Sequence, residues 1–208
     1  MTTQEAKRLE GLWAGDFGDA YIERNEGSGG ERARFWRHLL EKHPVGRVLE
    51  IGCNVGGNLE WIAKAVPPRE VYGIDISETA LSKLRTKLPT INALWSPARH
   101  LPFRDTWFDL VFTAGVLIHQ PDATLPVVMA EAVRCSRRYV LALEYFAEER
   151  QEVHYRGNEG ALFKRDYGRL YMESFPELAL VERGFLGKSD GWDDVTYWLF
   201  EKGRTDGG

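Results

Sequence analysis

The feature that most constrains the fold is an alternation of apolar runs with helix-like segments between residues 31 and 146. The runs are continuous, without a polar residue at every second position, which is typical of parallel strands covered by helices on both faces. This order predicts an α/β fold around a parallel sheet. The predicted strands are 46–52, 70–76, 91–96, 107–118 and 138–146; the predicted helices are 31–43, 58–66, 77–88 (with Ser77 as its N-cap) and 123–136.

The pattern changes after residue 160. Residues 163–175 predict a helix, and 178–186 and 194–202 predict two strands joined by a short loop with Gly and Asp. Such a short connection fits an antiparallel ribbon added to the edge of the sheet. The loop at 147–162 is long enough to favour a functional role.

Composition and charge exclude several classes of protein. The 208 residues suffice for one domain with a substantial core, and the net charge of −4 gives no footprint for nucleic acid or an anionic membrane. No apolar run is long enough to span a bilayer, and the start "MTTQEAKRLEG" lacks an apolar signal core, so we expect a cytoplasmic protein. Cys53 and Cys135 have no CxxC partner or metal-ligand spacing, so neither a disulfide nor a metal is expected. We expect a monomer or a homodimer.

The glycine-rich loop in "VLEIGCNVGGN" (48–58) follows the first predicted strand and leads into a helix. A dinucleotide-binding loop needs a second glycine at position 54, where the backbone approaches the pyrophosphate, and this chain has Asn54. No Gly-Lys-Ser/Thr follows, which excludes a Walker loop. The loop therefore favours a nucleoside without phosphates, and S-adenosylmethionine is such a molecule.

Asp75 supports a ligand that contains a ribose. It ends the second predicted strand, 23 positions after Gly52, near the spacing expected for an acceptor of ribose hydroxyls. The alternative is that the loop is only a tight turn and that Asp75 begins a helix. The order of strand, loop, helix, strand and Asp favours the cofactor site.

Four segments together resemble a class I S-adenosylmethionine-dependent methyltransferase: "VLEIGCNVGGNL", "VYGIDIS", "LPFRDTWFDLVFTAGVLIH" and "RYVLALEYF". The resemblance implies a Rossmann-like sheet of seven strands, mostly parallel, with helices on both faces and an antiparallel C-terminal strand. Four further segments resemble the methylases associated with pseudaminic acid biosynthesis, in which the loop also carries asparagine at this position. They are "LWAGDFGDAYIERN", "GVLIHQPD", "YRGNEGALFKRDYG" and "DDVTYWLFEK".

The same resemblance implies a set of cofactor contacts. Pro97 stands where such proteins normally have an acidic residue for the adenine amino group, so adenine is expected to be recognised by the backbone near Ala98 or by another side chain. The remaining implied contacts are Glu50, Gly52, Asn54 and Gly56 around the methionine part, Asp75 on the ribose, Ile76 on the adenine, and Val116 and Leu117 along the cofactor.

Methyl transfer is an in-line displacement, so the protein must align the acceptor and remove its proton. His119 follows the fourth predicted strand at the carboxyl edge of the sheet, where α/β proteins bind ligands, and imidazole suits a general base at neutral pH. The alternative is that His119 caps the turn before Pro121. Glu144 and Tyr145 end the fifth strand on the same edge; Glu144 is a catalytic carboxylate or a solvated strand-end charge, and Tyr145 is expected beside the substrate.

The segment before the first strand has an aromatic stripe at a spacing of four, which is typical of a helix packed on a core. Two glycines weaken a helix fixed on the core there, so a helical lid over the cofactor, built from residues 1–45, is the alternative that we favour. The stripe is Trp13, Phe17 and Tyr21, and the glycines are Gly15 and Gly18. In the lid, Trp13 is expected at the substrate, Tyr21 near the sulfonium through a cation–π contact, and Arg24 on a carboxylate.

Charged residues near the C-terminus leave the acceptor open. Tyr155, Arg156 and Lys164 suit an anionic acceptor such as a sugar acid, or they belong to a solvated loop. Asp193 and Asp194, together with Glu144, suit a cationic acceptor instead. Trp198 is expected in the core.

The sequence thus predicts an enzyme that methylates an O or N atom of a small molecule, with residues 46–202 as the methyltransferase domain and 203–208 as a tail. A nonulosonic, pseudaminic-type sugar is the acceptor that the narrower resemblance suggests. An amino acid or guanidino compound, a protein or RNA methyltransferase, and a scaffold without chemistry are the alternatives. The acidic balance argues against RNA.

Overall fold

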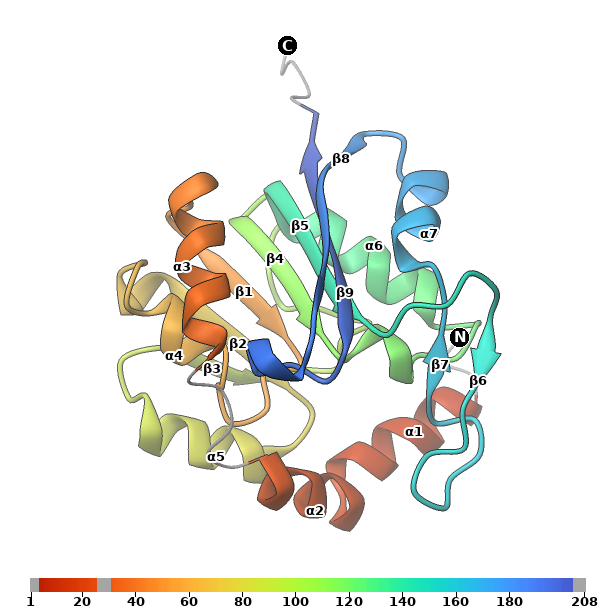
Figure 1. Ribbon diagram of the computed structural model, residues 1–208. Coiled ribbons are helices and arrows are strands. Elements are labelled where there is room, and N and C mark those ends of the chain that lie inside the picture. Colours follow the sequence, from red (N-terminus) through yellow and green to blue (C-terminus); the bar gives the residue numbers. More distant parts are fainter. Residues whose placement is uncertain (1–3, 26–30, 204–208) are drawn as a thin grey trace.

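A seven-stranded sheet forms the centre of the protein (Figure 1). The computed structural model describes residues 4–25 and 31–203. The strand order is β3-β2-β1-β4-β5-β9-β8, and β1 to β5 are parallel. The strands are β1 (Val48–Ile51), β2 (Val71–Asp75), β3 (Asn92–Trp95), β4 (Phe108–Ala114), β5 (Ser136–Glu144), β8 (Leu178–Leu186) and β9 (Val195–Lys202).

The C-terminal ribbon joins the sheet as predicted. β9 pairs antiparallel with β5, and β8 pairs antiparallel with β9. The predicted fold class, a mostly parallel sheet of seven strands with an antiparallel C-terminal strand, is therefore confirmed.

Helices cover both faces of the sheet, which explains why the central strands are apolar on both sides. On one face, α3 (Arg32–Lys42), α4 (Leu59–Ile62) and α5 (Glu78–Lys87) pack around the buried Trp36. On the other face lie α6 (Leu125–Cys135) and α7 (Tyr167–Ser174), with Trp198 of β9 in the core between them and the sheet, as expected. The predicted N-cap is also confirmed, because the Ser77 hydroxyl accepts from the Ala80 N–H of α5.

Two helices precede the sheet and lie across the edge where the parallel strands end (Figure 1). They are α1 (Gln4–Ala14) and α2 (Asp16–Asn25). The expectation that glycine would oppose helix formation here was wrong. Gly15 lies in the break between the helices. Gly18 lies inside α2, and glycine is required there because a Cβ would collide with the Trp13 carbonyl. Close packing of α1 on α2 thus outweighs the poor helix propensity of glycine.

Three predicted element bounds were too wide. β4 ends at Ala114, because Gly115 turns the chain with a φ of 69° into a short 3-10 helix, Leu117–His119. The helix expected at 163–175 begins only at Tyr167, since β7 (Phe163–Lys164) first pairs with β6 (Gln151–Glu152). α4 is regular only over Leu59–Ile62. Two further 3-10 turns are Pro68–Glu70 and Lys188–Asp190.

Over residues 4–25 and 31–203, no helix is both long and apolar enough to cross a bilayer. Cys53 and Cys135 are free thiols in the core. Within the same described segments, no group of three His, Cys, Asp or Glu residues is placed to hold a metal ion.

Candidate active site

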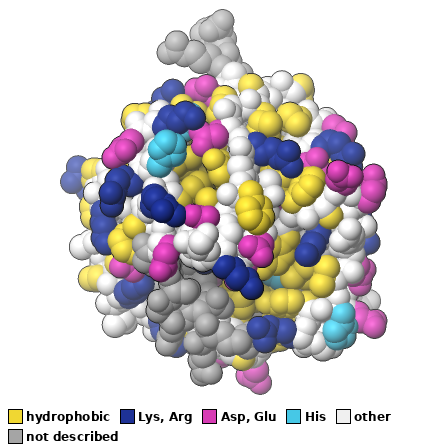
Figure 2. All heavy atoms as spheres, in the orientation of Figure 1, with side chains coloured by type: hydrophobic (Ala, Val, Ile, Leu, Met, Phe, Trp, Pro, Cys, Tyr) yellow, Lys and Arg dark blue, Asp and Glu magenta, His cyan; other side chains and the backbone are white. Residues whose placement is uncertain are grey.

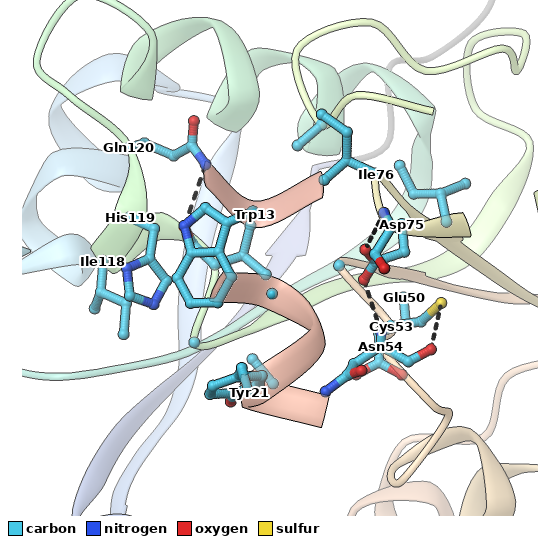
Figure 3. A pocket seen from close by; sticks show the side chains of 18 of the residues that line it. Trp13, Tyr21, Glu50, Cys53, Asn54, Asp75, Ile76, Ile118, His119 and Gln120 are labelled. Carbon is cyan, nitrogen blue, oxygen red and sulfur yellow. Dashed lines mark hydrogen bonds between the residues drawn. The ribbon is translucent and has the colours of Figure 1, made fainter. Parts of the chain in front are cut away.

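A deep pocket opens at the carboxyl edge of the parallel strands, and α1 and α2 cover it. In Figure 3, Asp75, Glu50 and Asn54 lie on one side of it, and Trp13 and His119 lie on the other. In the space-filling view, hydrophobic side chains gather on the lower part of the molecule, and charged side chains surround them (Figure 2). As Figure 3 shows, the pocket has a polar side at the loops after β1 and β2 and a more aromatic side under the lid.

The glycine loop after β1 is held close to β2. The N–H groups of Gly52 and Cys53 both donate to the Ile74 carbonyl, at 2.8 and 2.9 Å. Gly52 has a φ of 71°, and a Cβ at this position would collide with Val116, so glycine is required on both counts. Asn54 adopts a φ of 47°, a left-handed conformation that asparagine tolerates better than most residues.

Asp75 ends β2 and is fixed by this loop. Its Oδ2 accepts from the Asn54 N–H at 2.8 Å, and its Oδ1 accepts from the Ser77 N–H at 2.9 Å. Burial raises the pKa of this carboxyl, and the two N–H groups oppose the shift. Each oxygen keeps a further lone pair, so the carboxylate has acceptor capacity left for a ligand in the pocket.

Glu50 lies deeper, on β1. Its Oε1 accepts from the Asn58 side-chain amide at 2.7 Å, whereas its Oε2 is buried without a hydrogen-bond partner. Burial raises the pKa of Glu50 to about 8, against the Asn58 hydrogen bond and the positive charge of Arg32, which lower it. A buried carboxyl with one unpartnered oxygen is suited to receive a donor, above all a cationic one.

Arg32 and Asn58 are pocket residues that the sequence did not single out. Arg32 donates from Nε to the Gly191 carbonyl at 2.8 Å, lies 4.4 Å from the Trp192 ring, and reaches the Asn58 side-chain oxygen at 3.4 Å. The sequence feature that could have indicated Arg32 is its position at the start of α3, one turn before the buried Trp36. Its alignment with Asn58 depends on the packing of α3 against α4, which the sequence does not show.

A second group of lining residues lies around Ile76 and Ala98. The Ser96 hydroxyl donates to the His100 carbonyl at 2.7 Å and holds the loop after β3 in shape. Arg99 forms a 2.5 Å ion pair with Glu10 of α1. This pair ties the lid to the loop after β3.

His119 faces the lid from the turn after β4. Its Nδ1 lies 2.6 Å from the Ala161 carbonyl oxygen, and because a carbonyl only accepts, Nδ1 carries the proton. Nε2 is then the ring atom left as an acceptor. Burial lowers the pKa of His119 to about 4, so the imidazole is neutral at pH 7. Its ring lies between Trp13, at 4.4 Å, and Tyr155, at 5.5 Å.

Several predicted contacts lie outside the pocket. Glu144 is fully buried behind its wall, where its oxygens accept from the N–H groups of Val116, Leu117 and Ile118. Burial raises its pKa to about 7. It is therefore neither a solvated charge nor in reach of a substrate; it holds the turn that carries His119.

Four further predicted residues also lie away from the pocket lining. Gly56 has a φ of 77° and faces Leu84, and Leu117 lies in the core, so neither lines the pocket. Arg156 is exposed, and Lys164 lies outside the pocket with its Nζ 5.6 Å from the Tyr145 ring. The Arg24 side chain and the tail at 204–208 lie outside what the structure describes.

The other predicted residues do converge on the pocket, from segments far apart in the sequence. They are Trp13, Tyr21, Glu50, Gly52, Asn54, Asp75, Ile76, Ala98, Val116, His119, Tyr145 and Tyr155.

Comparison with known proteins adds a domain assignment. Residues 48–138 match the family model described as a methyltransferase domain. This match covers less than half of the chain. All strands from β1 to β4, with the glycine loop and Asp75, lie inside it.

Curated relatives match part of the chain. The chain is 32% identical over 101 residues to trans-aconitate 2-methyltransferase of Variovorax paradoxus (strain S110), covering 44% of this chain and 37% of that protein. It is 30% identical over 113 residues to methyltransferase GfsG of Streptomyces halstedii, covering 50% and 40%. The aligned parts thus span about two-fifths of the length of these relatives.

Solved structures share the fold of the whole chain. The 1,6-didemethyltoxoflavin-N1-methyltransferase of Burkholderia thailandensis, with bound S-adenosylhomocysteine, superposes with a TM-score of 0.76 at 13% identity over 98% of this chain and 91% of that one. The magnesium protoporphyrin IX methyltransferase of Synechocystis PCC 6803, also with bound S-adenosylhomocysteine, gives 0.71 at 14% identity over 94% and 99%. The class I methyltransferase fold predicted from the sequence is confirmed.

Proposed function

We propose that this protein is an S-adenosylmethionine-dependent methyltransferase that acts on an O or N atom of a small molecule. The observation that carries the proposal is the presence of two carboxyls in the pocket beside the glycine loop, the buried Glu50 and the half-buried Asp75. Asp75 is anchored with acceptor capacity left over, and Glu50 has one oxygen with no partner. These acceptor oxygens fit the hydroxyls of a ribose and the ammonium of an amino-acid part, and the side chain at Asn54 would crowd a pyrophosphate.

The chain's own residues suit each part of this cofactor. Asp75 would accept from the ribose hydroxyls, with Ile76 and Ala98 beside the adenine. Glu50 would accept from the ammonium of the methionine part, and Arg32 would pair with its carboxylate. When bound, the cofactor supplies a methyl group that is activated by a positively charged sulfur.

The lid excludes water from the transfer. α1 and α2 place Trp13 and Tyr21 over the pocket, and the Arg99–Glu10 pair holds them there. Tyr21 lines this side of the pocket, where its ring would favour a positively charged sulfur through a cation–π contact. Because the two helices cover the pocket, a small acceptor fits better than a folded protein or an RNA.

We assign His119 the role of taking the proton from the acceptor molecule. Its tautomer is fixed by the Ala161 carbonyl, and its burial keeps it neutral, so Nε2 is available as a base or as a hydrogen-bond acceptor that orients the acceptor. Glu144 contributes by holding the turn that positions His119.

The narrower resemblance of the sequence supports a finer proposal: the acceptor is a nonulosonic sugar or a related biosynthetic intermediate. Such sugars offer hydroxyl, amino and carboxylate groups. The lining that the structure describes does not include Arg156 or Lys164, so the support for a carboxylate-binding acceptor site is weaker than the sequence suggested.

Calorimetry with S-adenosylhomocysteine tests the cofactor assignment. Asp75→Asn should weaken binding by about 10-fold to 100-fold, the usual cost of a lost polar contact to a buried partner. Asp105→Asn is the matched control, because Asp105 is an exposed carboxylate paired with Arg134 and does not line the pocket. No binding to the wild type, or equal affinity in both variants, would contradict the proposal.

A further inference from the structure

The part of the pocket under the lid contains several aromatic rings and, in Asp193, a carboxylate that is not paired with Arg99. Trp13 contacts Tyr21 edge-on at 5.4 Å and His119 at 4.4 Å, and His119 lies 5.5 Å from Tyr155. Asp193, in the loop before β9, lines the same pocket and is exposed. We call Tyr21, Tyr145, Tyr155 and Asp193 the acceptor group.

The members of the acceptor group lie near one another. Burial raises the pKa of Tyr145, and the negative charge of Asp193 and the hydroxyls of Tyr21 and Tyr155 raise it further. These four side chains come from α2, the end of β5, the loop after β6 and the loop before β9. Only the folded chain brings them together.

The charges of the described lining divide between the two sides of the pocket. Its arginines are both engaged: Arg32 binds the Gly191 carbonyl beside Trp192, and Arg99 is paired with Glu10. Glu50 and Asp75 lie at the proposed cofactor site. Asp193 is the carboxylate that remains on the acceptor side, and His119 there is neutral.

We propose that the acceptor group binds an organic ammonium ion, so that the methylated atom is the nitrogen of an amine. The inference rests on the proposed function, and it selects the amine among the groups that a small acceptor offers. Tyrosine rings attract a cation through their faces, and Asp193 supplies the opposite charge at the pocket mouth. A carboxylate acceptor would instead approach Asp193 without a free arginine among the described lining residues to pair with it.

The transfer balances with the residues at hand. The bound ammonium first gives one proton to Nε2 of the neutral His119, which passes it on to water at the exposed Asp193 side of the pocket. The neutral amine nitrogen then forms a bond to the methyl carbon, while the carbon–sulfur bond breaks and leaves its electron pair on sulfur. The products are S-adenosylhomocysteine and a methylated ammonium, which the same aromatic faces accommodate.

A pair of probes of equal shape tests the binding site. Choline carries a quaternary ammonium, and 3,3-dimethylbutan-1-ol is its neutral counterpart. Titrated into the protein saturated with S-adenosylhomocysteine, with Trp13 and Trp192 as fluorescent reporters, choline should bind at least 10-fold more tightly than the alcohol. Asp193→Asn should remove most of this preference, and Asp194→Asn, whose side chain does not line the pocket, should keep it.

Equal binding of the two probes, or a preference that survives Asp193→Asn, would overturn the ammonium site. Saturation with S-adenosylhomocysteine is measured first, so a failure of the cofactor proposal is seen separately. A second experiment uses labelled S-adenosylmethionine and a small-molecule extract whose primary amines have been blocked by an N-acylating reagent. Loss of label relative to the mock-treated extract supports the inference, and equal labelling of both extracts contradicts it.

Discussion

Replacing Glu50 with glutamine should make the stability of the protein less dependent on pH. The side chain is 2% exposed, and burial raises its pKa from an ordinary value near 4.5 to about 8. Glutamine has the shape of the protonated carboxyl and keeps an oxygen that can accept from Asn58. Glu50→Gln therefore removes the titration and leaves the hydrogen bond in place.

The sign follows from the two pKa values. Between pH 4.5 and about 8 the folded protein keeps the Glu50 proton, whereas the unfolded chain has lost it. The wild type therefore loses stability as pH rises through this range, by about 1.4 kcal/mol per pH unit. The excess stability of Glu50→Gln over the wild type should grow by about 3 kcal/mol between pH 5.5 and 7.5, an upper value because the protein relaxes around a buried charge.

Urea unfolding of both proteins at pH 5.5, 6.5 and 7.5 measures this difference in stability. The contributions of all other titrating groups cancel, because the two proteins differ only at position 50. Binding should show the opposite trend: as Glu50 ionises, the wild type should bind S-adenosylmethionine more tightly with rising pH than Glu50→Gln does. Calorimetry in buffers with different ionisation heats should then show release of the Glu50 proton by the wild type. Parallel stability curves for the two proteins would refute the assignment of Glu50 as a buried, protonated carboxyl.

Further predictions concern His119 and the cap of α5. The ring of His119 should remain neutral down to pH 5 in an NMR titration, because burial lowers its pKa to about 4; a midpoint above pH 6 would contradict this burial. His119→Ala should lower turnover by about 10²-fold to 10⁴-fold if the imidazole takes the acceptor proton, and a loss of only a few-fold would leave it a positioning role. Ser77→Ala should lower the free energy of unfolding by about 1 kcal/mol, because the hydroxyl accepts from the Ala80 N–H; no change in urea unfolding would show that water replaces the cap.

The role of Glu144 depends on contacts that the sequence does not show. As a residue at the end of β5, it looked like either a catalytic group or a solvated charge. In the fold, Gly115 turns the chain so that three N–H groups after β4 point at this carboxylate and bury it. The partners are 26–28 residues away, and nothing near Glu144 in the sequence indicates them.

The helices of the lid are a second case in which contacts between segments decided the structure. Glycine propensity argued against helices before residue 26, yet Gly18 is what allows α2 to pack against the Trp13 carbonyl. Close packing between segments decided the outcome, and a propensity that treats each residue alone does not include it.

The sequence by itself determined the parallel sheet, its C-terminal ribbon, the glycine loop and the position of Asp75. Each of these depends on residues that are neighbours along the chain: apolar runs, a turn that needs glycine, and a strand that ends in a carboxylate. Only the tertiary structure decided that Arg32 meets Asn58, that Glu50 keeps an unpartnered oxygen, and that Tyr21, Tyr145, Tyr155 and Asp193 surround one space. The physical reason is that burial and contact between distant segments set these properties, and both arise only when the layers pack.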